Sequence, residues 1–255
     1  MGLYRLLGLV AVSAVLSPCP GHAQQVEPNR WFFQADPYLW TASASGTATI
    51  GDVAVPLDPG SAGISFLGNL FVEVGRNRWS GLIETGNISF DGSSVVGGSA
   101  PTGTSLGYSY KVFLARLFAV YRVTALETSQ GVSVLAGLRY NSHDVDVDAY
   151  DGPQDLDLAF SEGWWDPTVG VRYHTPLPGN FMVTASAEVG GFGIGSEFAW
   201  SATGVLGWRF SRPVGITLGY RYMSVDYRSP GSEPSDSFAY EGNLHGLMLG
   251  VLLVL

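Results

Sequence analysis

The sequence predicts an all-β protein, an antiparallel up-and-down transmembrane β-barrel, and three observations lead to that prediction. Hydrophobic residues make up 46% of the 255 residues and charged residues only 14%. Past residue 25 no run of about 18 uncharged apolar residues occurs, so no segment reads as a membrane-spanning helix. Many segments instead alternate apolar with small or polar residues, the pattern of a strand with one lipid-facing side. A closed barrel pairs all its backbone groups within lipid and therefore suits such a chain.

Ten segments have the length and composition of strands. In the segment from Val214, for example, Ile216, Leu218 and Tyr220 share one face, while glycines, Thr217 and Arg221 share the other. Eight strands are the alternative, if 181–210 or the first two segments pair differently. The ten expected strands span 31–41, 64–75, 78–90, 106–121, 131–147, 159–174, 181–192, 197–210, 214–228 and 238–255.

Short and long links alternate between these strands, as do the short periplasmic turns and longer extracellular loops of outer-membrane barrels. An even strand count then places both termini on the periplasmic side. The link at 193–196 is short where a long one is expected. The short links are 75–78, 123–130, 176–180 and 211–213, and the long links, rich in Gly, Ser, Pro and Asp, are 42–63, 91–105, 148–158 and 229–237.

The N-terminus has the features of a cleaved signal peptide. Arg5 precedes an apolar run over 6–16, and Gly21 and Ala23 are small residues at the −3 and −1 positions of a cleavage site. We expect a signal peptide at 1–23, a short N-terminal periplasmic segment at 24–30 and the barrel at 31–255, located in the bacterial outer membrane. Cys19 offers lipidation as an alternative, which the preceding proline disfavours. Cleavage after Ala23 leaves no cysteine and so no disulfide.

The charge balance narrows the set of partners. Without the signal, which carries Arg5 and no acidic residue, 12 Lys and Arg face 22 Asp and Glu, a net charge of −10. This excess argues against nucleic acid. We expect a monomer without cofactor or metal, in contact with outer-membrane lipid and lipopolysaccharide, and with the barrel-assembly machinery during biogenesis. A soluble β-sandwich is the alternative fold; the export signal and the aromatic residues near strand ends disfavour it.

The last third of the chain carries a series of ordered motifs. These are Trp164-Trp165-Asp166-Pro167-Thr168-Val169-Gly170-Val171-Arg172-Tyr173, Gly190-Gly191-Phe192-Gly193-Ile194-Gly195-Ser196, Gly219-Tyr220-Arg221-Tyr222-Met223-Ser224-Val225-Asp226-Tyr227 and Leu244-His245-Gly246-Leu247-Met248-Leu249-Gly250. Over 163–255 the chain resembles small outer-membrane β-barrel proteins of largely unassigned function. The resemblance implies the fold and the membrane, and it brings no catalytic set. The final strand is similar to the C-terminal assembly signal of such barrels, with Leu255 in place of the usual aromatic residue.

Charged residues at mid-strand positions are the first candidate site. If the apolar faces point to lipid, these side chains point into the lumen. There they would either pair into a hydrogen-bonded network that fills a small barrel, or set the selectivity of a narrow pore. The candidates are Glu73, Glu84, Arg116, Arg139, Arg172, Glu188, Arg209 and Arg221.

An acidic hairpin is the second candidate site. Asp144, Asp146 and Asp148 lie at a spacing of two and share one strand face, and Asp155 and Asp157 can oppose them across the hairpin. The two interpretations are a solvated extracellular hairpin and a contact with divalent cations or lipopolysaccharide. The run lacks the ligand spacing and turn glycine of an EF-hand loop.

The pair His143 and Asp144 raises a third functional class, a lipid A-modifying enzyme or a rim protease, since a histidine beside a carboxylate can act as a base. No zinc, Walker or dinucleotide motif accompanies it. The sequence therefore favours a non-enzymatic barrel with a structural or surface role and an Arg/Glu-filled lumen. A narrow pore for small solutes or ions is the first alternative.

Overall fold

The computed structural model describes residues 29–51, 53–57, 63–65, 69–95, 97–98, 105–150, 157–229 and 237–255. In these ranges the chain is all-β and contains no helix, and so no helix long and apolar enough to cross a membrane. Three short strands are β2 (Val53–Leu57), β3 (Gly63–Ser65) and β6 (Gly97–Gly98). Ten longer strands form the barrel: β1 (Trp31–Ile50), β4 (Leu70–Arg76), β5 (Trp79–Val95), β7 (Ser105–Arg122), β8 (Gly131–Tyr150), β9 (Asp157–Leu177), β10 (Phe181–Gly190), β11 (Phe198–Arg209), β12 (Val214–Ser229) and β13 (Phe238–Val254).

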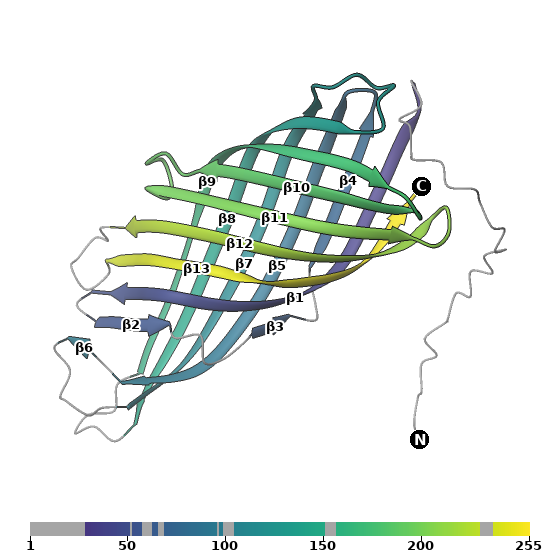
Figure 1. Cartoon of the computed structure of the whole chain (residues 1–255). Helices are drawn as coiled ribbons and strands as arrows, with labels where there is room; N and C mark the ends of the chain where they lie inside the picture. The colour runs from purple at the N-terminus through teal and green to yellow at the C-terminus, as the bar shows by residue number, and fades with distance from the viewer. Residues whose placement is uncertain are drawn as a thin grey trace, which may run out of the picture.

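The barrel closes through the first and last strands. Each long strand pairs antiparallel with its neighbour in sequence, and β13 pairs with β1 from Gln34↔Val254 to Ile50↔Phe238. Figure 1 shows the resulting tilted barrel. The ten-stranded antiparallel prediction is confirmed, and the eight-stranded alternative is wrong because β10 and β11 each pair with both neighbours.

Both ends of the barrel chain lie at the same rim. The amide of Phe33 donates to the carbonyl of Leu255 over 3.0 Å, and Leu255 donates back over 2.9 Å. The β4–β5, β7–β8, β9–β10 and β11–β12 turns lie at this rim as well, whereas the short β10–β11 turn lies at the other rim. Outer-membrane barrels place their short turns in the periplasm, so we name this rim the periplasmic end and the other the extracellular end.

Two strand predictions need correction. β1 continues to Ile50, although 42–63 was expected to be a loop, and its lumen-facing residues there include the buried Ala42, Ala44 and Ala48. Ala, Ser and Thr differ little in hydropathy, so the alternation that marks a strand is not visible in the sequence of this segment. The strand expected at 64–75 is split into β3 and β4, because the register to β1 shifts by two residues between Trp40↔Ser65 and Pro37↔Leu70, as at a bulge.

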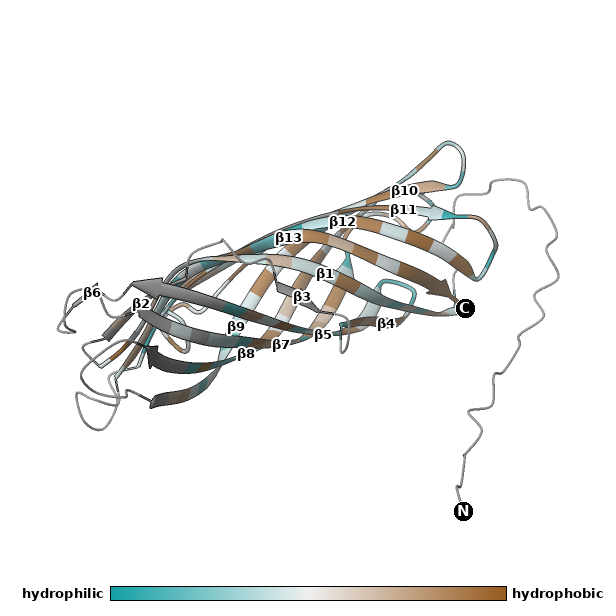
Figure 2. Cartoon of the chain, turned by 90° about the horizontal axis from the view of Figure 1, so that it is seen from below, coloured by the Kyte–Doolittle hydropathy of each residue, from teal (hydrophilic) through white to brown (hydrophobic). Residues whose placement is uncertain are grey.

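The outer surface of the barrel is apolar around its middle. Leu117, Leu138, Val171, Leu218 and Leu249 each expose more than two fifths of their surface although they lie within long strands. Figure 2 shows bands of hydrophobic residues alternating with less hydrophobic ones along β12 and β13. A soluble protein rarely exposes so continuous an apolar surface, whereas a barrel in lipid requires it.

Aromatic residues border this apolar surface at both ends. Trp79 lies 4.8 Å from Tyr121 between ring centroids near the periplasmic end, and Trp165 lies 5.0 Å from Tyr140 toward the extracellular end. Such girdles mark the membrane interfaces of outer-membrane barrels. Trp40 and Trp164 do not belong to them, because even-numbered residues of β1 and β9 face the lumen, where both are buried.

Among the described residues, side-chain contacts connect β9 and β12 above the end of the β10–β11 hairpin. The β10–β11 hairpin ends at Gly190↔Thr168 and Phe198↔Asp226, while β9 continues well beyond it to Asp157. Above the hairpin Trp164 stacks on Tyr227, with ring centroids 3.7 Å apart and 9° between planes. The Tyr227 hydroxyl donates to Oε1 of Glu162 over 2.7 Å. Aromatic packing therefore replaces the backbone ladder between β9 and β12 at this level.

Candidate functional site

The middle of the lumen is crossed by a cluster of charges centred on Glu84 of β5. The Tyr38 hydroxyl donates to its Oε1 over 2.7 Å, and Nη2 of Arg221 donates to the same oxygen over 2.5 Å. Nη1 of Arg116, directly opposite Glu84 on β7, pairs with Oε2. Glu84 is only 3% exposed, so two arginines from different walls neutralise a buried carboxylate.

The cluster extends to the far wall of the barrel. Nη2 of Arg116 pairs with Glu188 on β10, which also accepts a 3.4 Å hydrogen bond from Ser201. The guanidinium of Arg221 lies over the ring of Trp40, 5.4 Å from its centroid. Side chains of β1, β5, β7, β10 and β12 are thus tied together across the lumen. Removing one member of such a buried set leaves an uncompensated charge, which costs about 3–5 kcal/mol.

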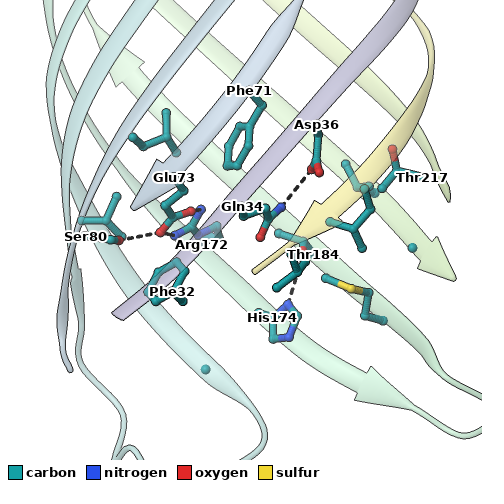
Figure 3. Close-up of a pocket in the computed structure, with 18 of the residues that line it drawn as sticks. Phe32, Gln34, Asp36, Phe71, Glu73, Ser80, Arg172, His174, Thr184 and Thr217 are labelled. Carbon is teal, nitrogen blue, oxygen red and sulfur yellow. Dashed lines mark hydrogen bonds and ion pairs between the residues drawn. The ribbon is translucent and has the colours of Figure 1, made fainter. Parts of the chain in front are cut away.

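A second ion pair lies nearer the periplasmic end. Arg172 of β9 donates from Nη1 and Nη2 to the two oxygens of Glu73 on β4, over 2.7 and 2.8 Å (Figure 3). The Ser80 hydroxyl donates to the same carboxylate over 2.5 Å. This bidentate geometry uses the planar fork of arginine, which a lysine cannot reproduce.

The eight charged residues predicted for the lumen all lie on lumen-facing strand positions. Six of them form the two clusters described above. Arg139 lies apart from these six and pairs with Asp166 over 3.0 Å. Arg209 lines the lumen close to the periplasmic end.

The structure adds a site that sequence reasoning missed, the buried carboxylate of Asp166. Its Oδ2 accepts from Arg139, from Asn141 over 3.0 Å and from the Ser196 hydroxyl over 2.9 Å. Its Oδ1 accepts from the backbone amide of Ser196 over 2.7 Å. Trp164 in turn donates its indole N–H to the Ser196 hydroxyl over 2.8 Å. Asp166 therefore fixes the β10–β11 turn onto the barrel wall.

A signal for this site was available in the sequence. Asp166 alternates in phase with Arg172 and out of phase with Val169 and Val171, so it belongs to the lumen-facing set. Its pairing with Arg139 depends on the register of β8 and β9, in which the two residues are direct partners. Periodicity identifies the face, whereas register identifies the partner.

The extracellular half of the lumen is filled by an aromatic cluster that contains His143. The Nδ1 atom of His143 lies 2.5 Å from the Tyr110 hydroxyl, and its ring packs 4.7 Å from Trp164 and 4.6 Å from Tyr240 between centroids. His143 is 1% exposed. The predicted pairing of His143 with Asp144 is wrong, because neighbours along a strand point to opposite faces and Asp144 faces outward.

The acidic hairpin is only partly described. Asp144 accepts a 2.5 Å hydrogen bond from Ser161, and Asp146 lies 3.9 Å from Lys111 with both side chains about half exposed. Asp148 and Asp157 are direct partners in the β8–β9 ladder, although their side chains, like all of Asp155, lie outside the described residues. Across the described ranges no group of three or more His, Cys, Asp or Glu residues is placed to hold a metal ion.

The periplasmic half of the lumen contains a cavity of about 840 Å³. The two charge clusters line its inner part, and the short turns surround its mouth. Figure 3 shows the part of its wall where Gln34 donates to Asp36 over 2.9 Å and His174 Nδ1 lies 3.1 Å from the Thr184 hydroxyl. The two halves of the lumen therefore differ: the extracellular half is packed and the periplasmic half is open.

Comparison with known proteins places the fold. The structure resembles the outer membrane protease OmpT from Escherichia coli with a TM-score of 0.52 and 9% sequence identity, covering 90% of this chain and 100% of that chain. The fold is that of an outer-membrane β-barrel. Lower similarity is found to the translocator domain of the autotransporter NalP from Neisseria meningitidis (TM-score 0.43, 13% identity, 89% of this chain and 90% of that chain) and to a major outer membrane protein from Thermus thermophilus (0.43, 14%, 88% and 99%).

No family model and no curated protein matches the chain. The resemblance to small barrels of unassigned function, which rests on the motifs of 163–255, stays a prediction. The comparisons support the coarser statement, a bacterial outer-membrane β-barrel fold.

Proposed function

We propose that this chain is an integral outer-membrane barrel, exported by a cleaved signal peptide over 1–23, which acts as a closed scaffold with a structural or surface role. The exposed apolar band and its aromatic borders support insertion in lipid. On this proposal the barrel is a monomer surrounded by outer-membrane lipid and lipopolysaccharide, and the assembly machinery inserts it.

The closure of the lumen carries the proposal. Arg116, Glu84 and Arg221 form a charged layer from wall to wall. Above this layer Trp40, Tyr110, Phe238 and other inward side chains are 0–1% exposed, so solvent does not reach them. A pore that conducts at rest needs a continuous aqueous path, and the packed layers oppose one.

Conductance in planar lipid bilayers tests the proposal. The refolded wild-type barrel is expected to show no steady conductance. Double replacement of Arg116 and Arg221 by Ser removes the bulk of the charged layer but leaves the aromatic layer above it, so that variant is expected to be silent as well. Steady wild-type channels, altered in ion selectivity by the double replacement, would establish the narrow pore instead.

The enzyme alternative has less support. The likeness to a protease concerns the fold alone at 9% identity. His143 is enclosed by Tyr110, Trp164 and Tyr240, and its neighbour Asp144 points away from it. Mass spectrometry of lipid A from expressing cells and a peptide-cleavage screen are expected to show no product. Activity that is lost in a His143→Ala variant would overturn this expectation.

A further inference from the structure

The charged residues that line the cavity divide into an inner set with equal numbers of basic and acidic side chains and an outer set that is mostly basic. The inner part has three arginines and three glutamates, which form the ion pairs described above. Among the described residues that line the mouth, the acidic groups are the Asp36 side chain and the carboxylate of Leu255, and Glu127 of the β7–β8 turn lies near enough to interact with Arg122. The mouth carries five arginines: Arg30, Arg78, Arg122, Arg209 and Arg212.

Two of the mouth arginines are held by neutral groups. Nη1 of Arg78 donates to the carbonyl oxygens of Arg122, Val123 and Thr124 over 3.0–3.1 Å. Nη2 of Arg122 donates to the carbonyl oxygens of Thr128 and Gln130 over 2.6 and 3.1 Å. Carbonyl partners orient a guanidinium without cancelling its charge. Both positive charges are therefore fixed in place at the mouth.

The excess of positive charge is specific to this cavity. The chain past residue 23 has 12 Lys and Arg against 22 Asp and Glu. Eight of these 12 basic residues line the cavity, whereas only four of the 22 acidic residues do, namely Asp36, Glu73, Glu84 and Glu188. This count of basic and acidic residues covers every residue that lines the cavity, so it holds whatever hydrogen bonds a single arginine makes. An acidic protein thus presents a cationic opening, which attracts anions.

The walls between the mouth and the inner ion pairs are partly apolar. Phe32, Phe71 and Leu82 line one side, and Met182 and Leu252 line the other walls. Figure 3 shows the rings of Phe71 and Phe32 among the side chains that line the cavity together with Glu73 and Arg172. A volume of about 840 Å³ lies within the range of small-molecule sites, and mixed apolar walls with a few fixed charges are typical of them.

We propose that the periplasmic half of the lumen is a binding site for a small organic anion that carries a phosphate or carboxylate and an apolar group. The anionic group lies at the arginine mouth, and the apolar group lies against Phe32, Phe71 and Leu82. The ligand enters from the periplasm, since the extracellular half of the lumen is packed. This site goes beyond the scaffold role and does not depend on it.

Isothermal titration calorimetry of the folded full barrel in detergent tests the site with three probes that share one ring system. These are 1-naphthyl phosphate, the neutral 1-naphthalenemethanol and the cationic 1-naphthylmethylamine. We expect saturable binding of the phosphate, weakened by added NaCl, and much weaker binding of the other two probes. Equal affinity for the neutral and anionic probes, or affinity for the anion that does not change with salt, would overturn the proposal.

Charge-removing variants locate the site. Arg209→Gln and Arg212→Gln are each expected to weaken binding of 1-naphthyl phosphate about fivefold, as the loss of one partly solvated charge contact predicts. Arg228→Gln is the matched control, because Arg228 is exposed at the extracellular end. Heat-dependent gel mobility shows that each variant is folded. An equal loss of affinity for 1-naphthyl phosphate in the control and in the two mouth variants would contradict the assignment. The salt dependence of binding to the wild-type barrel tests the proposal without any variant.

The same measurement distinguishes a lipid headgroup from a soluble anion. The barrel is reconstituted in vesicles of phosphatidylcholine alone or mixed with phosphatidylglycerol. Weaker apparent binding of 1-naphthyl phosphate in the mixed vesicles, by a larger factor for the wild type than for Arg209→Gln, identifies an anionic lipid headgroup at the mouth. Unchanged binding identifies a soluble periplasmic anion, and both results retain the site.

Discussion

Asp166 connects three parts of the molecule through one carboxylate. It accepts hydrogen bonds from Arg139 and Asn141 of β8, and from the backbone amide and the hydroxyl of Ser196 in the β10–β11 turn. The Asp166 side chain is fully buried. A buried carboxylate is stable only when its oxygens are fully bonded and its charge is matched. The four hydrogen bonds meet this condition, so the residue helps to hold the β10–β11 turn against the wall, together with the backbone hydrogen bonds from Gly191 to Pro167 and from Glu197 to Asp226.

Replacement of Asp166 by Asn tests this role. Arg139 would stay buried without a counter-charge, so the free energy of unfolding is expected to fall by about 3 kcal/mol. Urea denaturation of the refolded barrel, followed by tryptophan fluorescence, measures the change. Asp144→Asn is the matched control, since Asp144 lies one strand away on the outer, solvated face, and a change within about 0.5 kcal/mol is expected there. Similar losses in both variants would contradict the anchoring role.

At this scale the sequence predicted which residues face the lumen better than it predicted their partners. The alternation predicts Arg139 in the lumen, and Asp166, which alternates in phase with Arg172, lies outside the predicted set although it carries the same signal. The contact of Arg116 with Glu188 crosses the lumen and joins residues 72 positions apart. Such contacts depend on barrel closure, which no local pattern encodes.

Among the elements, the seam between β1 and β13 has the strictest steric requirement. A Cβ built on Gly246 would overlap the carbonyl oxygen of Thr41 on β1. Only a residue without a side chain allows the two strands to approach at this point. Fifteen residues of each strand pair along the seam, so a local separation there weakens the contact that closes the barrel.

Gly246→Ala is therefore expected to lower the yield of folded, compact barrel on refolding and to reduce stability by about 1–3 kcal/mol, the usual cost of overpacking. The fraction of fast-migrating species in unheated gel samples measures the yield. Gly81→Ala is the control, because a Cβ there meets no atom within 4 Å. A yield equal to that of the control would show that the seam adjusts without cost.

The length of the β10–β11 hairpin shows what an element-level prediction misses. The sequence shows a short link at 193–196 where a long loop is expected. It does not show that β9 therefore extends past the hairpin without a β10 partner. Stacking of Trp164 on Tyr227 fills that place. The two residues are distant in sequence, so only the closed barrel brings them together.

For the whole molecule, barrel closure predicts a characteristic electrophoretic behaviour. Unheated samples in mild detergent gels are expected to migrate as a compact species, faster than boiled samples, because a closed ladder of ten strands resists unfolding by detergent alone. Electrophoresis of the purified protein with and without boiling checks this. Identical mobility would contradict a stable closed barrel.

The orientation of the barrel can be tested with single cysteines, since cleavage of the predicted signal removes Cys19. Asp146→Cys lies on the exposed side of the acidic hairpin, and Glu127→Cys lies in the exposed turn at the opposite end. A membrane-impermeant maleimide is expected to label the first variant in intact cells and the second only after the outer membrane is permeabilised. The reverse pattern would invert the orientation and place the arginine mouth outside the cell.

The sequence by itself determined the fold class, the number of long strands and the face on which the charged residues lie. These properties follow from the two-residue period of a strand and from turn chemistry, both of which are local. Only the tertiary structure decided the ion partners, the division into a packed extracellular half and an open periplasmic half, and the arginine mouth. These properties arise when the side chains of ten strands meet in one lumen. The contacts then join residues that no local sequence pattern relates.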